Sequence, residues 1–428
     1  MMKRCSLFFV VFLFVTVRLF AGSEALKEKL QVIDGICDIE QLESEHYSAK
    51  YVCKVKQFLN HKDTAAGFFT QRVIVNHVGF DRPTVLVTEG YGAGYALRAQ
   101  YQDELSRLFN MNVVFVEHRY FLQSTPDPLN WDYLTAENSA YDLHHVLTLF
   151  KNIYPSKWVS SGVSKGGQTT LLYRAYFPDD VDFSVPYVAP WNRGIEDGRH
   201  EVFLKHVGTK KERKRIEQFQ KTVLKKRGEI LPLLTNYCNK KKLEFRISMD
   251  EVLDYTILEY DFAFWQWGTA LSAIPSSSAE PKVLFDHLMA VSSPDYFAEN
   301  QPYVSFNVQA ARELGYYGYD TAPFRKWLHI RSAKGYFNRI MVPQNVSVTF
   351  DPALYHKVYS FLEKNDPKMI FIYGEIDPWS ATRIQDFKGK KNLQIYIQPR
   401  GSHGTRISTM PEELKTKIIA QINIWLKE

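Results

Sequence analysis

The residues Gly162-Val163-Ser164-Lys165-Gly166 constrain the fold of this chain more than any other stretch of its sequence. They follow a short β-rich run, Trp158 to Ser161, and precede a helical pattern that Pro178 ends. A Gly-x-Ser-x-Gly turn between a strand and a helix is typical of a nucleophile elbow. In such an elbow the serine adopts strained backbone angles, and the glycines remove side chains that would collide. We therefore predict that Ser164 is a nucleophile; the alternative is an ordinary glycine-rich turn.

Strand and helix patterns alternate on both sides of this turn. Buried strands are expected at 83–88, 111–116, 158–161, 369–373 and 393–397, and helices at 100–109, 135–154, 352–364 and 411–427. This order predicts a doubly wound, mostly parallel sheet with right-handed crossovers. Two earlier segments, 51–55 and 68–75, alternate in the manner of antiparallel strands.

The alternation stops between about residues 194 and 343, where charged and aromatic helical patterns replace it. A basic amphipathic helix is expected at 210–227, followed by the aromatic-rich stretch 255–268. We therefore predict a helical cap inserted into the sheet domain. The expected parts are a signal peptide at 1–23, the first part of the sheet domain at 24–194, the cap at 195–343, and the second part of the sheet domain at 344–428.

The N-terminus has the pattern of a secretory signal peptide. Lys3 and Arg4 precede an apolar run from Leu7 to Val17, and the small residues Ala21 and Ser23 follow. We expect cleavage near Ser23 and export of the mature protein to a periplasm or out of the cell, with no later segment able to span a bilayer. Without residues 1–23 the formal net charge falls from +6 to +3, which is too mild to indicate a nucleic-acid partner.

In an exported chain, neighbouring cysteines favour a disulfide. We predict one between Cys37 and Cys53, and we expect Cys238 to be a buried thiol. No cysteine or histidine cluster has metal-ligand spacing, and no phosphate-binding glycine loop is present. The sequence therefore predicts neither a metal nor a cofactor.

An acid and a histidine each follow a predicted strand downstream of Ser164. Their order, Ser164, Asp377, His403, is the order that the α/β-hydrolase fold uses. Because ligands bind at the C-terminal ends of parallel strands, the three side chains are expected to converge. We leave open that Glu375 or Asp386 is the acid instead, or that His403 is a surface-loop residue.

The expected roles follow from the chemistry of acyl transfer. His403 would take the proton from Ser164 and return it to the leaving group, and Asp377 would hold the imidazole tautomer. The backbone N–H groups of Lys165 and Tyr91, the latter in a glycine-rich loop after the strand 83–88, would form an oxyanion hole.

Five motifs together resemble a known family. They are Thr88-Glu89-Gly90-Tyr91, Val116-Glu117-His118-Arg119-Tyr120, Gly162 to Gly167, Gly374 to Trp379, and Gly401-Ser402-His403. In these residues the chain resembles the bacterial secreted prolyl tri- and tetrapeptidyl aminopeptidases, serine peptidase family thirty-seven. It is more distantly similar to the lysosomal Pro-Xaa carboxypeptidase and dipeptidyl peptidase II family. Lys165 favours the bacterial family, because the lysosomal relatives tend to have tyrosine after the nucleophile.

The resemblance implies an α/β-hydrolase with a helical cap that cleaves peptides near a free N-terminus, commonly after proline. Such an enzyme must bind an ammonium group, for which Glu89 and Glu117 are candidates; their alternative role is as buried structural partners, for example of Arg119. Phe264, Trp265 and Trp267 are candidate walls of a proline pocket, although each could be cap core. Alternative functions are a carboxypeptidase or dipeptidyl peptidase, a small-ester hydrolase, and a non-catalytic binding module.

Overall fold

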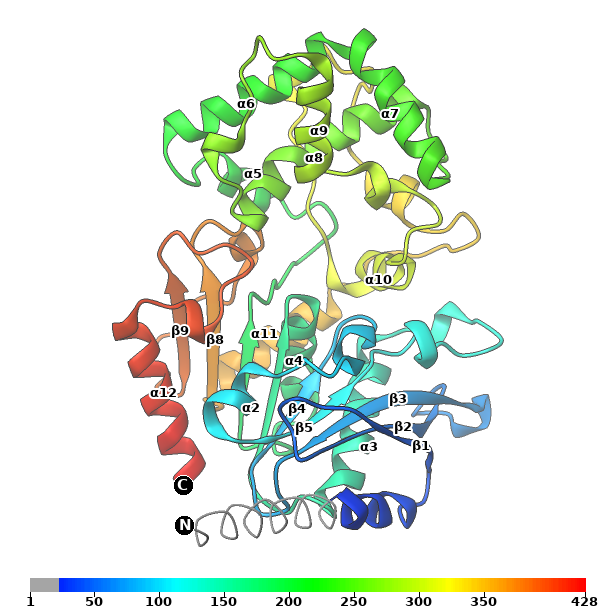
Figure 1. Cartoon of the computed structure of the whole chain (residues 1–428), viewed down its shortest axis with the longest axis vertical. Coiled ribbons are helices and arrows are strands. Elements are labelled where there is room, and N and C mark those ends of the chain that lie inside the picture. The colour runs from blue at the N-terminus through cyan, green and yellow to red at the C-terminus, as the bar shows by residue number, and fades with distance from the viewer. Residues whose placement is uncertain (1–22) are drawn as a thin grey trace, which may run out of the picture. The chain divides into compact units, whose positions relative to one another are not determined.

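A computed structural model describes residues 23–428 of the chain (Figure 1). The predicted signal peptide lies outside these residues, apart from its last position. Among the described residues, no helix is both long and apolar enough to cross a bilayer.

The described residues contain a nine-stranded sheet in the order β1-β2-β3-β5-β4-β6-β7-β8-β9. The strands are β1 Ile36–Leu42, β2 Ala49–Phe58, β3 Phe68–His77, β4 Thr84–Thr88, β5 Asn112–Val116, β6 Trp158–Val163, β7 Phe183–Tyr187, β8 Met369–Gly374 and β9 Leu393–Gln398. β4 pairs with β5 and β6 in parallel, whereas β1, β2, β3 and β5 pair in antiparallel succession. The parallel centre and the antiparallel 51–55 and 68–75 segments are therefore as predicted.

Two strands, β1 and β7, are absent from the sequence-based prediction. β1 is interrupted by a register shift between Cys37 and Glu40, so its side chains do not alternate regularly. β7 contains Pro186, which lacks the N–H that a central strand normally donates.

By contacts, the chain forms two compact units. The first holds the described residues up to Pro186 together with Pro367–Ile370 and Lys415–Glu428; the second holds Tyr187–Asp366 and Phe371–Leu414. The predicted cap, residues 195–343, lies within the second unit. Its boundaries as a separate domain remain a prediction.

In the first unit, helices connect the parallel strands. They are α2 Glu104–Phe109, α3 Ala136–Lys151 and α4 Lys165–Tyr176; α12, Glu412–Lys427, lies at the C-terminal end of the chain. Thr135 begins α3 by accepting a hydrogen bond from the Asn138 N–H, which satisfies one of the unpaired donors of the first turn.

The second unit is rich in helices. They are α5 Arg199–Leu204, α6 Lys210–Lys225, α7 Arg227–Lys241, α8 Met249–Trp267, α9 Pro281–Val291, α10 Val304–Gln309 and α11 Ala353–Lys364. Capping boxes begin α6 at Thr209 and α8 at Ser248. α6, α7 and α9 gather around α8 (Figure 1), whose buried residues include most of the aromatic-rich stretch.

The predicted disulfide is wrong: Cys37 and Cys53 are both free thiols. Cys37 lies opposite Lys54 in the β1–β2 pair and is exposed, whereas the Cys53 side chain is buried. Because side chains alternate between the two faces of a strand, this register directs the two sulfurs differently. Cys238 is buried, as expected.

Candidate active site

Ser164 occupies the sharp turn between β6 and α4 in the first unit. Its backbone angles are φ 59° and ψ −120°, outside the regions that non-glycine residues favour. It is partly exposed, whereas Lys165 and the following residues of α4 are buried. The predicted elbow is therefore present, and its strain is held by the surrounding structure.

The glycines of the elbow are required by close backbone approach. A Cβ on Gly162 would lie 2.4 Å from the Gly166 carbonyl oxygen, and one on Gly166 would lie 2.9 Å from the Thr88 carbonyl oxygen. Thr88 reinforces the contact, since its hydroxyl donates to the Gly166 carbonyl at 3.1 Å. The end of β4 is thus fastened to the first turn of α4.

The loop after β4 is also tied to the elbow through Lys165. The ammonium group of this buried residue donates to the Gly90 carbonyl at 2.7 Å. The N–H of the same peptide unit, that of Tyr91, donates to Glu89 Oε1 at 3.0 Å. The Gly90–Tyr91 peptide is therefore fixed at both its oxygen and its nitrogen.

Glu89 is buried, and its carboxylate accepts hydrogen bonds from this loop. Besides the Tyr91 N–H, its carboxylate accepts a hydrogen bond from the Tyr95 hydroxyl at 2.7 Å. Burial raises the pKa of Glu89, although these hydrogen bonds and the nearby Lys165 charge act in the opposite direction. Its second partner, Tyr95, was not identified from the sequence.

Glu117 is fully buried and engaged by donors of its own unit. Its carboxylate accepts from the Ala93 N–H at 2.8 Å, from the N–H and hydroxyl of Ser124 at 3.1 and 2.9 Å, and from Arg72 at 3.2 Å. Its guanidinium partner is thus Arg72, not Arg119 as the structural alternative supposed. The carboxylate links the loop after β4 to the loop after β5.

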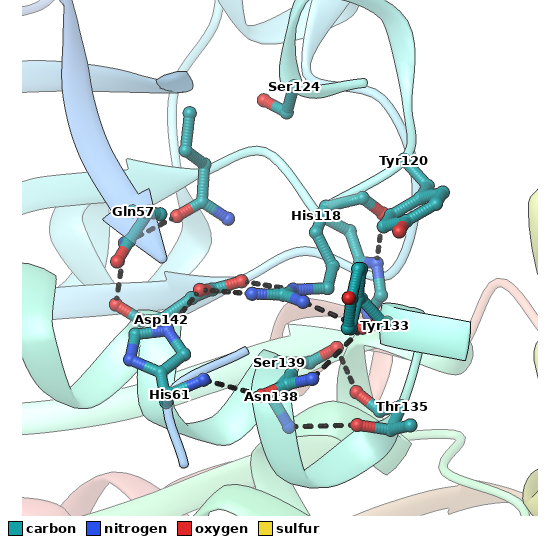
Figure 2. A network of polar contacts seen from close by, with 12 residues as sticks. Gln57, His61, His118, Tyr120, Ser124, Tyr133, Thr135, Asn138, Ser139 and Asp142 are labelled. Carbon is teal, nitrogen blue, oxygen red and sulfur yellow. Dashed lines mark hydrogen bonds and ion pairs between the residues drawn. The ribbon is translucent and has the colours of Figure 1, made fainter. Parts of the chain in front are cut away.

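Arg119 instead forms a buried ion pair with Asp142 of α3, and Figure 2 shows Asp142 within its network of polar contacts. Its Nε and Nη2 atoms lie 2.6 and 2.7 Å from the two carboxylate oxygens, and Nη1 donates to the Tyr133 carbonyl at 2.7 Å. His61 also contacts the carboxylate at 2.8 Å. The Glu-His-Arg-Tyr motif therefore contributes two buried networks that hold the loop after β5.

Asp377 and His403 meet in the second unit. His403 Nδ1 lies 2.7 Å from Asp377 Oδ2, and both side chains are buried. Asp377 Oδ1 accepts from the Trp379 N–H at 3.1 Å, which fixes the carboxylate at the start of a 3₁₀ turn. The alternative acids Glu375 and Asp386 are exposed, and Glu375 accepts the Arg400 N–H.

A carboxylate on Nδ1 selects the tautomer of an imidazole. It keeps the proton on Nδ1, leaves Nε2 as the basic nitrogen, and stabilises the charged ring after proton uptake. The Asp377–His403 pair can therefore act as a proton acceptor and donor.

The end of α8 lies against His403. The His403 N–H donates to the Gln266 carbonyl at 2.8 Å, and the Trp267 ring stands at 84° to the imidazole with a centroid distance of 5.9 Å. Trp267 is exposed, whereas Phe264 and Trp265 are buried. This contact could not be predicted from the sequence, because Gln266 and Trp267 lie 137 and 136 positions before His403 in the chain.

His200 was also not identified from the sequence. It is buried and contacts the Pro378 carbonyl at 3.1 Å and the Asn192 side chain at 3.0 Å. Burial lowers its pKa to about 4, so it is neutral at physiological pH and supports the turn that carries Asp377.

Within residues 23–428, no group of three or more histidine, cysteine, aspartate or glutamate residues is arranged to hold a metal ion. The chemistry available at the elbow and at the Asp377–His403 pair is nucleophilic attack and proton transfer.

The sheet order, the parallel central strands and the serine elbow after β6 define an α/β-hydrolase. A sequence model of the PS-10 peptidase S37 family matches residues 22–427. The chain belongs to this family and is a serine peptidase.

The chain is also similar to other known proteins in sequence and in structure. The chain is 27% identical over 414 residues to the prolyl tri/tetrapeptidyl aminopeptidase of Streptomyces mobaraensis, covering 94% of this chain and 84% of that protein. Solved structures that match include proline iminopeptidase of Mycobacterium smegmatis, with a TM-score of 0.39, 11% identity and coverage of 87% and 98%. A peroxisomal α/β-hydrolase of Saccharomyces cerevisiae matches with a TM-score of 0.38, 11% identity and 88% coverage of both chains.

Proposed function

We propose that this peptidase releases short N-terminal fragments, principally tripeptides, from peptides with a free N-terminus, cutting after proline. The observation that carries the proposal is Ser164 in its strained elbow, in a chain that also pairs a histidine with a buried carboxylate. The choice of substrate is supported by the similarity to the Streptomyces mobaraensis enzyme named for tri- and tetrapeptide release.

In the proposed mechanism Ser164, His403 and Asp377 act as a catalytic triad. His403 Nε2 takes the hydroxyl proton as Ser164 Oγ attacks the carbonyl carbon, and an acyl-enzyme forms when His403 returns that proton to the leaving amine. Water then attacks the acyl-enzyme: His403 takes a proton from the water and gives it to Ser164 Oγ as the acyl group leaves. Asp377 holds the Nδ1 proton and stabilises the charged imidazole.

The Lys165 N–H, at the start of α4, is the first proposed oxyanion donor, and the Tyr91 N–H is the second. Because the Tyr91 N–H donates to Glu89 Oε1 at 3.0 Å, it can serve the oxyanion only when this bond is released. Each such donor is worth about 3 kcal/mol of transition-state stabilisation.

For the substrate ammonium group, Glu89 is the better of the two predicted acids. Glu117 is fully buried and accepts four hydrogen bonds, so we assign it to the fold. Glu89 retains slight exposure and has fewer donors among the hydrogen bonds described above. Phe264, Trp265 and Trp267 remain candidates for contact with the substrate.

Export of the mature protein is also part of the proposal, with residues 1–23 removed as a signal peptide. The basis is the charged, apolar and small-residue order of the N-terminus. Mass spectrometry of protein from the culture medium or periplasm should then give a chain that begins near Glu24; a full-length chain retained in the cytoplasm would contradict export.

The test of substrate choice is hydrolysis of fluorogenic Ala-Ala-Pro, Ala-Pro and Pro conjugates, each with a free and an acetylated N-terminus. We expect the free tripeptide conjugate to be preferred, and its turnover to fall by at least about 10³ in Ser164→Ala. Equal turnover of acetylated conjugates would overturn ammonium recognition. Activity on simple esters but on no peptide would support the ester-hydrolase alternative.

A further inference from the structure

A cavity of about 400 Å³ in the second unit lies beside the Asp377–His403 pair. One wall is the end of α8, with Phe264, Trp265 and Trp267, continued by residues 268–271. Other lining residues lie at the end of β9 and just after it, among them Gln398 and Arg400. Its volume falls within the range of about 300–1,000 Å³ that is typical of ligand pockets.

Four lining residues connect this cavity to the predicted catalytic residues. Its lining includes Ile376, directly before Asp377, and Ser402 and Gly404, on either side of His403. Trp267 lines the cavity and also packs against the imidazole of His403. A molecule in the cavity would therefore lie next to the histidine.

The histidine of a serine peptidase gives its proton to the leaving amine. The part of the substrate that departs must consequently pass this side chain. We propose that the cavity is the binding site for the leaving segment, that is, for the residues that follow the cleaved bond of a peptide. This inference rests on the proposed peptidase mechanism and extends it to the other side of the scissile bond.

The lining suits a peptide segment. Trp267 is 63% exposed and offers a flat aromatic face for a side chain. The Gln398 side chain also lines the cavity; its amide oxygen accepts a hydrogen bond from the Thr409 hydroxyl at 2.7 Å, and the amide carries the donor and acceptor groups that a peptide backbone needs. An acyl chain of a lipid would leave these polar groups without partners.

The lining also contains an ion pair, Arg400 with Glu212. Arg400 Nη2 lies 2.7 Å from Glu212 Oε1, and its guanidinium lies 5.9 Å from the centre of the Trp265 ring. Glu212 also caps α6, so the pair has little freedom to move. These charges favour an occupant with a polar backbone.

The experiment fills the cavity and compares substrates that differ only after proline. Ala270 lines the cavity, and Ala273 belongs to the same short turn but does not line it, so Ala270→Trp and Ala273→Trp form a matched pair. The substrates are Ala-Ala-Pro methyl ester and the hexapeptide Ala-Ala-Pro-Ala-Phe-Ala. The measured quantity is the ratio of kcat/KM for the hexapeptide to that for the ester.

We expect Ala270→Trp to lower this ratio by at least about tenfold and Ala273→Trp to leave it within about twofold of the wild type. An unchanged ratio in a folded Ala270→Trp protein would overturn the assignment of the cavity. If the wild type cleaves neither substrate, the proposed function itself fails, and this result is distinct from cleavage of both without an effect of the variant.

A second measurement needs only the wild type. The free peptide Ala-Phe-Ala, which corresponds to the leaving segment, should inhibit hydrolysis of the hexapeptide, because both would occupy the cavity, and should inhibit hydrolysis of the methyl ester less. Absence of inhibition at concentrations well above the KM of the hexapeptide would also overturn the proposal, even if Ala270→Trp does not fold.

Discussion

At the scale of single residues, Glu259 shows how burial changes the chemistry of a side chain. It lies on α8, where the hydroxyl of Tyr317 donates to both carboxylate oxygens at 2.9 and 2.8 Å and that of Tyr319 donates to one at 2.7 Å. Burial raises its pKa to about 8, more than these hydrogen bonds lower it. The folded protein therefore holds a proton here at neutral pH.

This proton makes stability depend on pH. A carboxyl group whose pKa is raised on folding stabilises the fold fully below its unfolded pKa of 4.5, and the contribution is lost as pH rises through about 8. Glu259→Gln has no such proton to lose. We measure the free energy of unfolding of both proteins with urea at pH 5 and at pH 8. We expect the value for Glu259→Gln minus the value for the wild type to be larger at pH 8 than at pH 5 by at least about 1.4 kcal/mol.

The neighbouring Asp261, whose pKa burial raises to about 7, is present in both proteins, so its contribution largely cancels. The exposed Glu363 supplies the control, since Glu363→Gln should leave the pH profile unchanged. Parallel profiles for the wild type and Glu259→Gln would show that the buried carboxyl group is not protonated.

At the scale of elements, the turn between β6 and α4 depends on its glycines. A methyl group on Gly162 would lie 2.4 Å from a backbone oxygen that cannot move without opening the turn. We predict that Gly162→Ala lowers the free energy of unfolding by at least about 2 kcal/mol and abolishes activity. Urea unfolding and turnover of the tripeptide conjugate measure the two effects.

Gly228 is the matched control for this substitution. It lies in α7, and nothing is within 4 Å of where its Cβ would stand. Because alanine is the better helix former, Gly228→Ala should leave stability unchanged or raise it by up to about 1 kcal/mol. Equal effects of the two substitutions would contradict the role of close approach at the elbow.

A second prediction at this scale concerns the ion pair between the loop after β5 and α3. Asp142 is buried with Arg119, so Asp142→Ala leaves an uncompensated buried charge. We expect a loss of about 3–5 kcal/mol in the free energy of unfolding. The exposed pair Lys282–Asp286 of α9 provides the comparison, and Asp286→Ala should cost at most about 0.5 kcal/mol. Similar losses would mean that Arg119 and Asp142 do not stabilise the fold as a buried pair.

At the scale of the whole molecule, the sequence predicts features that depend on local spacing. The elbow at Ser164 and the strands that precede Asp377 and His403 are visible because glycine positions and short apolar runs lie within a few residues. For the same reason the central parallel strands and the helix-rich cap sequence could be predicted.

The remaining features depend on contacts between distant parts of the chain. Sequence spacing does not identify Arg72 as the partner of Glu117 or Tyr317 as a partner of Glu259. Many compact arrangements of the chain would give these side chains a hydrogen-bond partner, and the spacing does not distinguish among them. The expected disulfide failed for a related reason: nearness in sequence does not determine which face of β1 and β2 each cysteine occupies.

We propose that Ser164 is a nucleophile and that His403 and Asp377 activate it. The most direct measurement is the rate at which a fluorophosphonate labels the purified protein, with the modified residue located by mass spectrometry. We predict one adduct, on Ser164, and a labelling rate lower by at least about 10³ in His403→Ala. Labelling of another residue, or an equal rate in His403→Ala, would contradict the claim.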